Sequence, residues 1–247
     1  MIKKITALVL LFVSTITLAQ EKVLLRLNYE KGESYTMDMK MNQVMGAGLM
    51  TNKMNIVMNQ KITSVTGDSY NATVKFDRMT MDMSQGGMNV SYDSSKKESE
   101  LDEAGKVMKT RMDPTLKTII SMKGNNLGEV LESKAEPNIP GAGDYANESS
   151  VVYPKHKVAV GDTWTMTKSK NGLDMNFEYK VKSIEANNVV LEIGGKVAGI
   201  GAGDIKGSMN IDRKSGVPTK SNINMDMDVQ GQAMKTAMEM TYVASRG

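Results

Sequence analysis

The sequence predicts an all-β protein built around one large curved antiparallel sheet or half-barrel with little helix, and a flattened β-sandwich is the alternative. Two observations lead to this prediction. Apolar and polar residues alternate over long stretches such as Leu173–Lys182 and Ile223–Val229, which gives each strand one dry and one wet face. The chain also repeats itself, so that two similar halves are expected to join in one sheet.

The first 19 residues have the features of a secretory signal peptide. Lys3 and Lys4 provide a positive start, Ile5–Val13 is apolar, and Thr17–Ala19 supplies the small residues of a cleavage site. The stretch is too short and wrongly flanked for a transmembrane helix. We therefore expect a soluble mature chain that begins near Gln20, lies in the periplasm or outside the cell, and has no transmembrane segment after cleavage.

The composition argues against several classes of partner. Cleavage would remove two of the 31 basic residues and none of the 28 acidic ones, so the mature chain carries a net charge of about +1. This balance gives no electrostatic reason to bind nucleic acid or an anionic membrane surface. The chain has no Cys, which excludes disulfides and a lipid anchor on Cys, and a domain of this size does not need disulfides to fold.

Two halves of the mature chain resemble each other. Gly32–Met37 matches Gly161–Met166, and Met88–Val90 matches Met209–Ile211. Between these blocks the apolar positions align as well: Met54, Ile56, Met58 and Ile62 match Leu173, Met175, Phe177 and Val181. The sequence therefore predicts a single all-β domain over residues 20–247, with a first repeat over about 20–133, a linker over 134–150 and a second repeat over about 151–247.

Gly and Pro mark the connections between the predicted strands. Lys134–Ser150 is rich in Pro, Gly and small polar residues, which is typical of a loop between the halves. Just before it, Thr118–Met122 and Leu127–Leu131 predict a hairpin that turns at Gly124–Asn126. A different pattern holds in Ser94–Pro114, which is dense in charge and is either a short amphipathic helix or a solvated loop. Its apolar residues at near-helical spacing are Leu101, Ala104, Met108 and Met112.

The residues that common enzymes and metal sites need are scarce. His156 is the single histidine, so any Ser–His–Asp triad would depend on it, and no Gly-x-Ser-x-Gly elbow occurs. Aromatic residues make up 5% of the chain, too few for the platforms of a sugar-binding cleft. A zinc site would want several His or Cys ligands. We therefore predict no catalytic residues, no metal site and no cofactor.

Methionine is the unusual component, with 23 Met against three Phe and one Trp. Many Met occupy alternate positions that other apolar residues fill in the second half, as Met58 matches Phe177. Because Phe cannot replace a thioether ligand, this favours packing over metal binding. The Met faces form either a closed core or a soft apolar groove for acyl chains, with a lid around Met108 and Met112. The candidate groove residues are Met37, Met39, Met41, Met79, Met81, Met225 and Met227.

The parity of the strand pattern changes within one predicted strand. Ala72, Val74 and Phe76 are at even positions, whereas Met79–Met83 places its methionines at odd ones. If both sets face the same side, the chain must slip by one residue, which predicts a β-bulge at Asp77–Arg78.

Short motifs resemble known families. Ile211–Pro218 resembles a strand–turn–strand step of the LolA/LolB-like lipoprotein-carrier superfamily, in which a strand ends in Asp, turns through Gly and resumes after Pro. This resemblance implies a curved half-barrel with a helical lid and an apolar groove for lipid. Through Lys31–Tyr35, Gly128–Val130 and Val160–Trp164, most of the mature chain is similar to uncharacterised exported β-proteins common in Bacteroidota, and that similarity implies no activity.

These observations predict an exported, non-catalytic binding protein for a hydrophobic or lipid-like ligand or for a cell-envelope partner. Two alternatives stay open. A Met-rich periplasmic copper-binding protein is one, because thioethers prefer Cu(I). The other is an enzyme with a loop-borne site near His156.

Overall fold

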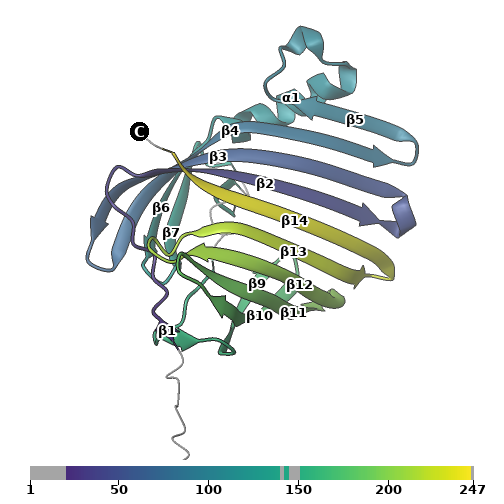
Figure 1. The fold of residues 1–247 in the computed structure, drawn as a ribbon. Helices are drawn as coiled ribbons and strands as arrows, with labels where there is room; N and C mark the ends of the chain where they lie inside the picture. The colour runs from purple at the N-terminus through teal and green to yellow at the C-terminus, as the bar shows by residue number, and fades with distance from the viewer. Residues whose placement is uncertain (1–20, 140–141, 145–150, 246–247) are drawn as a thin grey trace, which may run out of the picture.

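A computed structural model describes residues 21–139, 142–144 and 151–245 of the chain (Figure 1). The expected signal peptide and cleavage site lie outside this part. The described residues form a twelve-stranded antiparallel sheet that curves without closing, a short two-stranded sheet, one α-helix and three 3₁₀ turns. The prediction of an all-β protein with one large curved sheet is confirmed.

The large sheet has the strand order β7-β6-β4-β3-β2-β14-β13-β12-β11-β10-β9, and β5 pairs with the end of β4 beyond the stretch that pairs with β6. Its strands are β2 Ser34–Met45, β3 Met50–Thr66, β4 Ser69–Gln85, β5 Met88–Asp93, β6 Ile119–Asn125, β7 Val130–Glu136, β9 Thr163–Lys170, β10 Leu173–Ile184, β11 Asn188–Gly199, β12 Gly201–Asp212, β13 Pro218–Val229 and β14 Gln232–Ser245. The small sheet pairs β1 Lys22–Val23 with β8 Val158–Ala159. The helices are α1 Glu103–Leu116, η1 Gly46–Gly48, η2 Glu98–Glu100 and η3 Ala142–Asp144.

Strands from the two parts of the chain lie on opposite sides of the β2–β14 pair (Figure 1). The two Gly-led entries have the same backbone geometry. Gly32 has a φ of 96° and donates its N–H to the Ile62 carbonyl at 2.9 Å, while Gly161 has a φ of 95° and donates to the Val181 carbonyl at 2.8 Å. Positive φ favours glycine at both points. The division of the domain into repeats and linker stays a prediction.

A β-bulge lies where the change of strand parity predicts it. Val57 of β3 pairs with Arg78, whereas the next residue, Met58, pairs with Phe76, so Asp77 is the extra residue of β4. This slip turns Phe76 and Met79 to the same face, and both are buried. The predicted bulge is confirmed.

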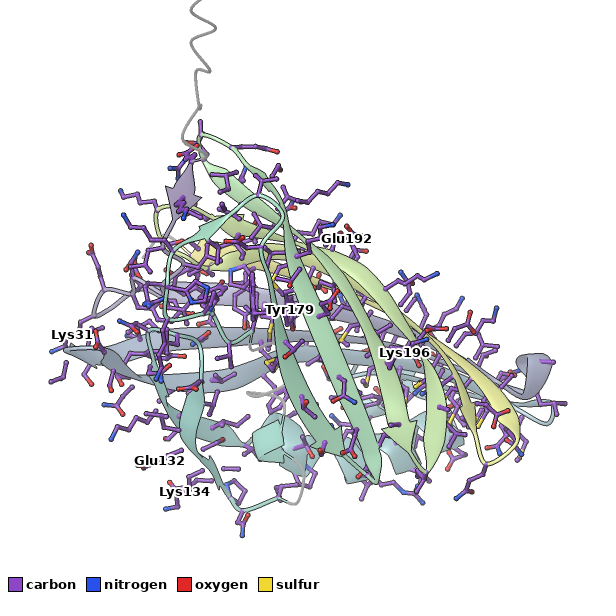
Figure 2. The ribbon with its side chains drawn as sticks, turned by 90° about the horizontal axis from the view of Figure 1, so that it is seen from below. Lys31, Glu132, Lys134, Tyr179, Glu192 and Lys196 are labelled. Atoms are coloured by element: carbon purple, nitrogen blue, oxygen red, sulfur yellow. The ribbon has the colours of Figure 1, made fainter. Side chains whose placement is uncertain are left out.

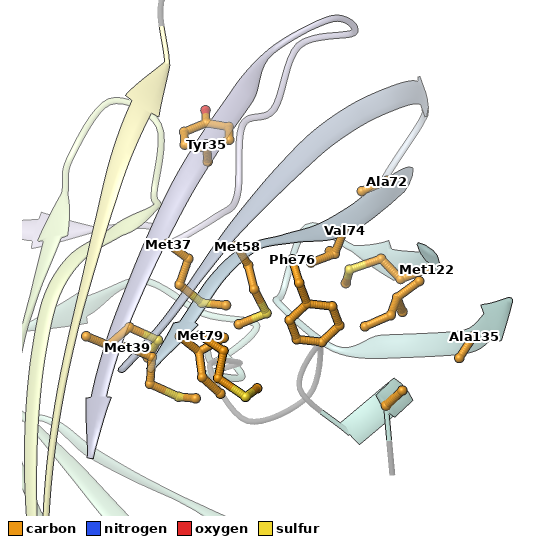
Figure 3. Packing of buried hydrophobic residues seen from close by; sticks show 14 of the residues in the cluster. Tyr35, Met37, Met39, Met58, Ala72, Val74, Phe76, Met79, Met122 and Ala135 are labelled. Carbon is orange, nitrogen blue, oxygen red and sulfur yellow. The ribbon is translucent and has the colours of Figure 1, made fainter. Parts of the chain in front are cut away.

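The apolar side chains face the inside of the curved sheet. We call this side the inner face and the opposite side the outer face. Two packed clusters lie on the inner face, one against β2–β6 (Figure 3) and one against β9–β13. On β11 the alternate residues Glu192 and Lys196 point outward into solvent, whereas Tyr179 of β10 lies inside (Figure 2). Period-two alternation therefore became one dry and one wet face, as expected.

Two predicted boundaries near the β6–β7 hairpin are wrong. Lys134–Glu136, placed at the start of the linker, pair with β6 and end β7. The turn lies at residues 126–129, because Gly124 and Asn125 are still in β6. Gly124 is needed inside the strand, since a Cβ there would lie 2.5 Å from the ring of Tyr70. The Asn125 side chain stabilises the turn by accepting the N–H groups of residues 127 and 129, each at 3.0 Å.

The charged segment after β5 contains an amphipathic helix, which decides between the two alternatives. α1 begins at an N-cap, Asp102, whose carboxylate accepts the Gly105 N–H at 2.7 Å. Leu101 and Met108 are buried, and Met112 packs against the cluster on β2–β6. The helix thus covers part of the inner face, and Figure 1 shows it near β4 and β5.

Glycines on the inner face of β11 and β12 let neighbouring backbones approach closely. A Cβ built on Gly207 would lie 2.2 Å from the carbonyl oxygen of Asn222, and one on Gly203 would lie 2.3 Å from that of Asp226. On the outer face, a Cβ on Gly194 would meet nothing within 4 Å. Glycine in a strand is typical of such bends and close approaches.

We expect Gly207→Ala to lower the free energy of unfolding by about 1–3 kcal/mol, because the methyl group must push the β13 backbone away. Gly194→Ala is the matched control and should stay within about 0.5 kcal/mol of the wild type. Urea unfolding followed by circular dichroism measures both. Equal stabilities of the two variants would show that β12 and β13 do not approach as described.

Candidate functional site

The inner face has two ends that differ in burial. We call the end with the β2–β3, β4–β5, β9–β10, β11–β12 and β13–β14 turns the hairpin end, which lies to the right in Figure 1, and the other the core end. Side chains at the core end are buried almost completely, as Ile56, Leu191 and Ile211 are 0% exposed. Burial decreases toward the hairpin end.

Two segments outside the large sheet fill the core end. The Leu27 N–H donates to the Asn126 carbonyl, and the Tyr153 N–H donates to the Leu127 carbonyl, both at 2.8 Å. The Tyr153 hydroxyl donates to the Gly216 carbonyl at 2.7 Å, and Tyr153 is buried. These bonds fix both segments against the inner face, so that the core end is a closed core.

Tyrosines cluster where the N-terminal segment crosses β2 and β4. The Tyr29 ring lies 5.4 Å from the ring of Tyr35 and 4.8 Å from that of Tyr70 between centroids. Burial raises the pKa of Tyr29 well above its usual value and that of Tyr70 to about 12. These hydroxyls therefore stay protonated at neutral pH, which suits a packing role.

A small cavity of about 50 Å³ lies beside these tyrosines. Its lining includes Met37, Met58 and Gln60 from the sheet and Leu27 from the N-terminal segment. A volume of this size holds one or two water molecules and is too small for an acyl chain. The cavity therefore does not provide the predicted groove as it stands.

The hairpin end carries a continuous methionine surface. Register pairs Met41 with Met54 and Met238, Met54 with Met81, Met45 with Met50 and Met234, and Met234 with Met227. The half-buried members on this face are Met41, Met45, Met50, Met54, Met81, Met83, Met225, Met234 and Met238. Their partly exposed thioethers form an apolar surface that adapts to varied shapes.

The structure divides the predicted groove residues between the two environments. Four of the seven are buried: Met37 at 4%, Met39 at 3%, Met79 at 0% and Met227 at 7% exposure. The other three, Met41, Met81 and Met225, are half-buried at the hairpin end. All seven lie on the inner face, which also carries six half-buried methionines that the prediction did not include: Met45, Met50, Met54, Met83, Met234 and Met238. Their alternation with polar residues on β2–β4 and β14 could have indicated them.

The junction of β4, β5 and α1 lies beside this surface and is held by an ion pair on the outer face. Arg78, at the bulge, donates from Nη2 to Asp93 Oδ2 at 2.7 Å and from Nε to Oδ1 at 3.3 Å. Ser95 donates its N–H and hydroxyl to Asp93 Oδ1 at 3.0 and 2.7 Å. These donors hold the pKa of the Asp93 carboxyl well below its usual range. Nearby, burial raises the pKa of Tyr92 to about 12, and the negative charge of Asp113 adds to this shift.

A larger hollow of about 410 Å³ lies on the outer face, across β2, β12, β13 and β14. Its side chains include Asn42, Asp204, Lys206 and Asp226, and Lys235 pairs with Asp226 at 3.6 Å. Charges of both signs at such exposed positions favour water over hydrocarbon. This hollow is therefore a polar feature of the outer face, although Met225 and Thr236, which register places on the inner face, also line it.

Further features that bear on function are the single histidine, groups that could hold a metal ion and helices that could span a membrane. His156 is exposed in the segment before β8. Among the described residues, no group of three or more His, Cys, Asp or Glu is placed to hold a metal ion. No helix in the described part of the chain is long and apolar enough to cross a membrane.

Comparison of the sequence with known proteins finds one family. Residues 143–244 match the model of a family of unknown function, DUF6263. The match supports the predicted similarity to an uncharacterised family, and it includes β8–β13 and nearly all of β14. No curated protein matches the chain.

Among solved structures, one of lipovitellin, which concerns lipid–protein interactions, is similar with a TM-score of 0.54. The similarity covers 88% of this chain and 25% of the lipovitellin chain, at 8% sequence identity. The chain thus corresponds to a quarter of that protein. At this identity the likeness concerns the fold alone.

We expect Met108→Ala to lower the free energy of unfolding by about 2–4 kcal/mol and to expose the amides of α1 to exchange, because Met108 attaches the helix to the inner face. Val107→Ala, at a 52% exposed neighbour on the same helix, is the control and should change little. Hydrogen exchange and urea unfolding measure these effects. Unchanged exchange of α1 in Met108→Ala would contradict the anchoring role.

Asp93→Asn should make the protein less stable at pH 7, with a difference that closes in acid. The folded pKa of Asp93 is depressed, so its contribution is present above the unfolded pKa of about 4 and is lost as the pH falls toward the folded pKa. Urea midpoints of both proteins at pH 7 and at pH 3 measure the effect. A difference that is the same at both pH values would rule out the ion pair as its cause.

Proposed function

We propose that this protein is an exported, non-catalytic binding protein that holds a hydrophobic or lipid-like molecule against the methionine surface at the hairpin end. One observation carries the proposal: an apolar face that is closed at one end stays half-buried at the other, where methionine fills most of its positions. Flexible thioether side chains fit alkyl chains of different shape without fixed partners. We place the protein in the periplasm or outside the cell, on the strength of the predicted signal peptide.

Two further observations support a lipid-like ligand. The solved structure of lipovitellin, whose fold is similar, concerns lipid–protein interactions. α1 covers the inner face beside β5, where a helical cover would shield a bound chain from water. The closed core end would stop such a chain from extending through the sheet. Recognition of a cell-envelope partner through the same surface is the other form of this proposal.

Copper binding remains the second candidate function, because register places thioethers of Met41, Met54 and Met238 on neighbouring strands. Such neighbouring sulfurs are a donor set that Cu(I) prefers. Native mass spectrometry of protein purified from its own envelope separates the candidates. Bound lipid supports the proposal, and bound copper supports the alternative. Protein that carries neither favours recognition of a protein partner. An activity that is lost in His156→Ala would favour the enzyme.

We expect Met225→Lys to weaken binding of the neutral fluorophore N-phenyl-1-naphthylamine by at least about tenfold, because it places a charge on the apolar surface. Asn224→Lys puts the same charge on the outer face, one residue away on β13, and should bind as the wild type does. Fluorescence titration measures both affinities, and circular dichroism verifies folding. Equal affinities of the two variants would overturn the assignment of the ligand to the inner face.

A further inference from the structure

A row of three neutral polar side chains crosses the methionine surface. Gln43 of β2 pairs with Asn52 of β3 on one side and with Thr236 of β14 on the other. All three share the inner face with the buried residues Met39, Ile56 and Met240 of their own strands. Thr236 comes from a distant part of the chain, since 191 positions separate Gln43 from Met234, which lies on the same strand as Thr236.

Methionines surround this row on every side that the register defines. The row ends against Met83 on β4, which pairs with Asn52, and against Met225 on β13, which pairs with Thr236. The two flanking rows along the strands are Met41, Met54, Met81 and Met238 toward the core end, and Met45, Met50, Met227 and Met234 toward the hairpin end. We call Asn52, Gln43 and Thr236 the polar row.

The hydrogen-bonding capacity of the polar row is largely unused. Thr236 is 6% exposed, and its buried Oγ1 has no partner among the described residues. Asn52 Oδ1 is buried and also lacks a partner within the described chain. Gln43 donates from Nε2 to the Met234 sulfur at 3.2 Å, and a thioether is a weak acceptor. Buried polar groups are normally paired, so an orphaned hydroxyl and amide oxygen need an explanation.

The charges near the polar row restrict what could pair with it. Among the described inner-face residues of β2–β5 and β10–β14 at the hairpin end there is no Asp, Glu, Lys or Arg. Lys168 and Lys170 share this face only on the edge strand β9. An orphaned amide oxygen requires a donor, and an orphaned hydroxyl can both donate and accept. An uncharged group that carries an O–H or N–H satisfies both, whereas a carboxylate or phosphate cannot donate to Asn52.

We propose that the polar row binds the uncharged head group of an amphiphile, such as an alcohol, a glyceride or a fatty amide, whose hydrocarbon chain lies on the flanking methionines. This inference rests on the proposed function and names its ligand class. The methionines at the flanking positions can move aside at low cost, because their side chains have several rotatable bonds. A head group then pairs with atoms that are unsatisfied in the free protein, so its lost hydrogen bonds to water are replaced by bonds to the polar row.

Two probes with the same acyl chain test the proposal. 1-Monooleoylglycerol carries two hydroxyl donors, and methyl oleate carries none. Displacement of N-phenyl-1-naphthylamine from the full mature chain gives the affinity of each. We expect the wild type to bind monooleoylglycerol more tightly, and Thr236→Val to weaken that binding about fivefold while it leaves methyl oleate within about twofold.

The variants separate a lost contact from a lost fold. Valine has nearly the shape of threonine and removes an unpaired hydroxyl, so Thr236→Val should be at least as stable as the wild type. Ser221→Ala is the matched control, because Ser221 is 3% exposed on neighbouring β13 and its Oγ is also unpaired, but it lies two residues nearer the core end than the Met238 row. It should leave both affinities unchanged. Gln43→Met removes the amide at constant length and should reproduce the effect of Thr236→Val.

The outcomes distinguish this inference from the function on which it rests. Binding of both probes with equal affinity, or no change in Thr236→Val and Gln43→Met, overturns the head-group site and leaves the hydrophobic binding function standing. A preference for oleate over monooleoylglycerol also overturns it, because the head group is then an anion. If neither probe displaces the fluorophore from the wild type, the proposed function itself fails.

Discussion

The need to cover one apolar face governs this structure. A twelve-stranded sheet with period-two patterning presents a large dry surface, and a flat sheet would leave that surface in water. Curvature of the sheet removes part of this surface from water. Inner-face glycines such as Gly203 and Gly207 let β12 and β13 approach closely. Segments around Leu27 and Tyr153 fill the core end, and α1 covers the side near β5.

Coverage is unequal, and the inequality gives the molecule its candidate site. The same residue type serves two purposes along one strand: Met37 and Met39 are buried in the closed core, whereas Met41 and Met45 are half-buried. A closed core favours residues with few rotamers, while a surface that must adapt favours methionine. Methionine therefore occurs in both environments, and under the proposed function only the half-buried methionines at the hairpin end would adapt to a ligand.

The bulge at Asp77–Arg78 links the sheet to its helical cover. It keeps Phe76 and Met79 on the same face, and it lies where β4 exchanges one neighbour, β6, for another, β5. Arg78 leaves the bulge on the outer side and pairs with Asp93 at the end of β5, just before the segment that forms α1. One inserted residue thus maintains the dry face and positions the ion pair at the start of the cover.

The sequence by itself determined the all-β class, the dry face of most strands and the bulge, because side-chain parity is a local property. It misplaced the β6–β7 turn, since the reason for Gly124 is the ring of Tyr70 on another strand. Only the tertiary structure decided which methionines are buried, because burial depends on curvature and on segments far away in the chain. It also decided that Asn52, Gln43 and Thr236 form one row, since the pairing of β2 with β14 joins residues from opposite ends of the chain.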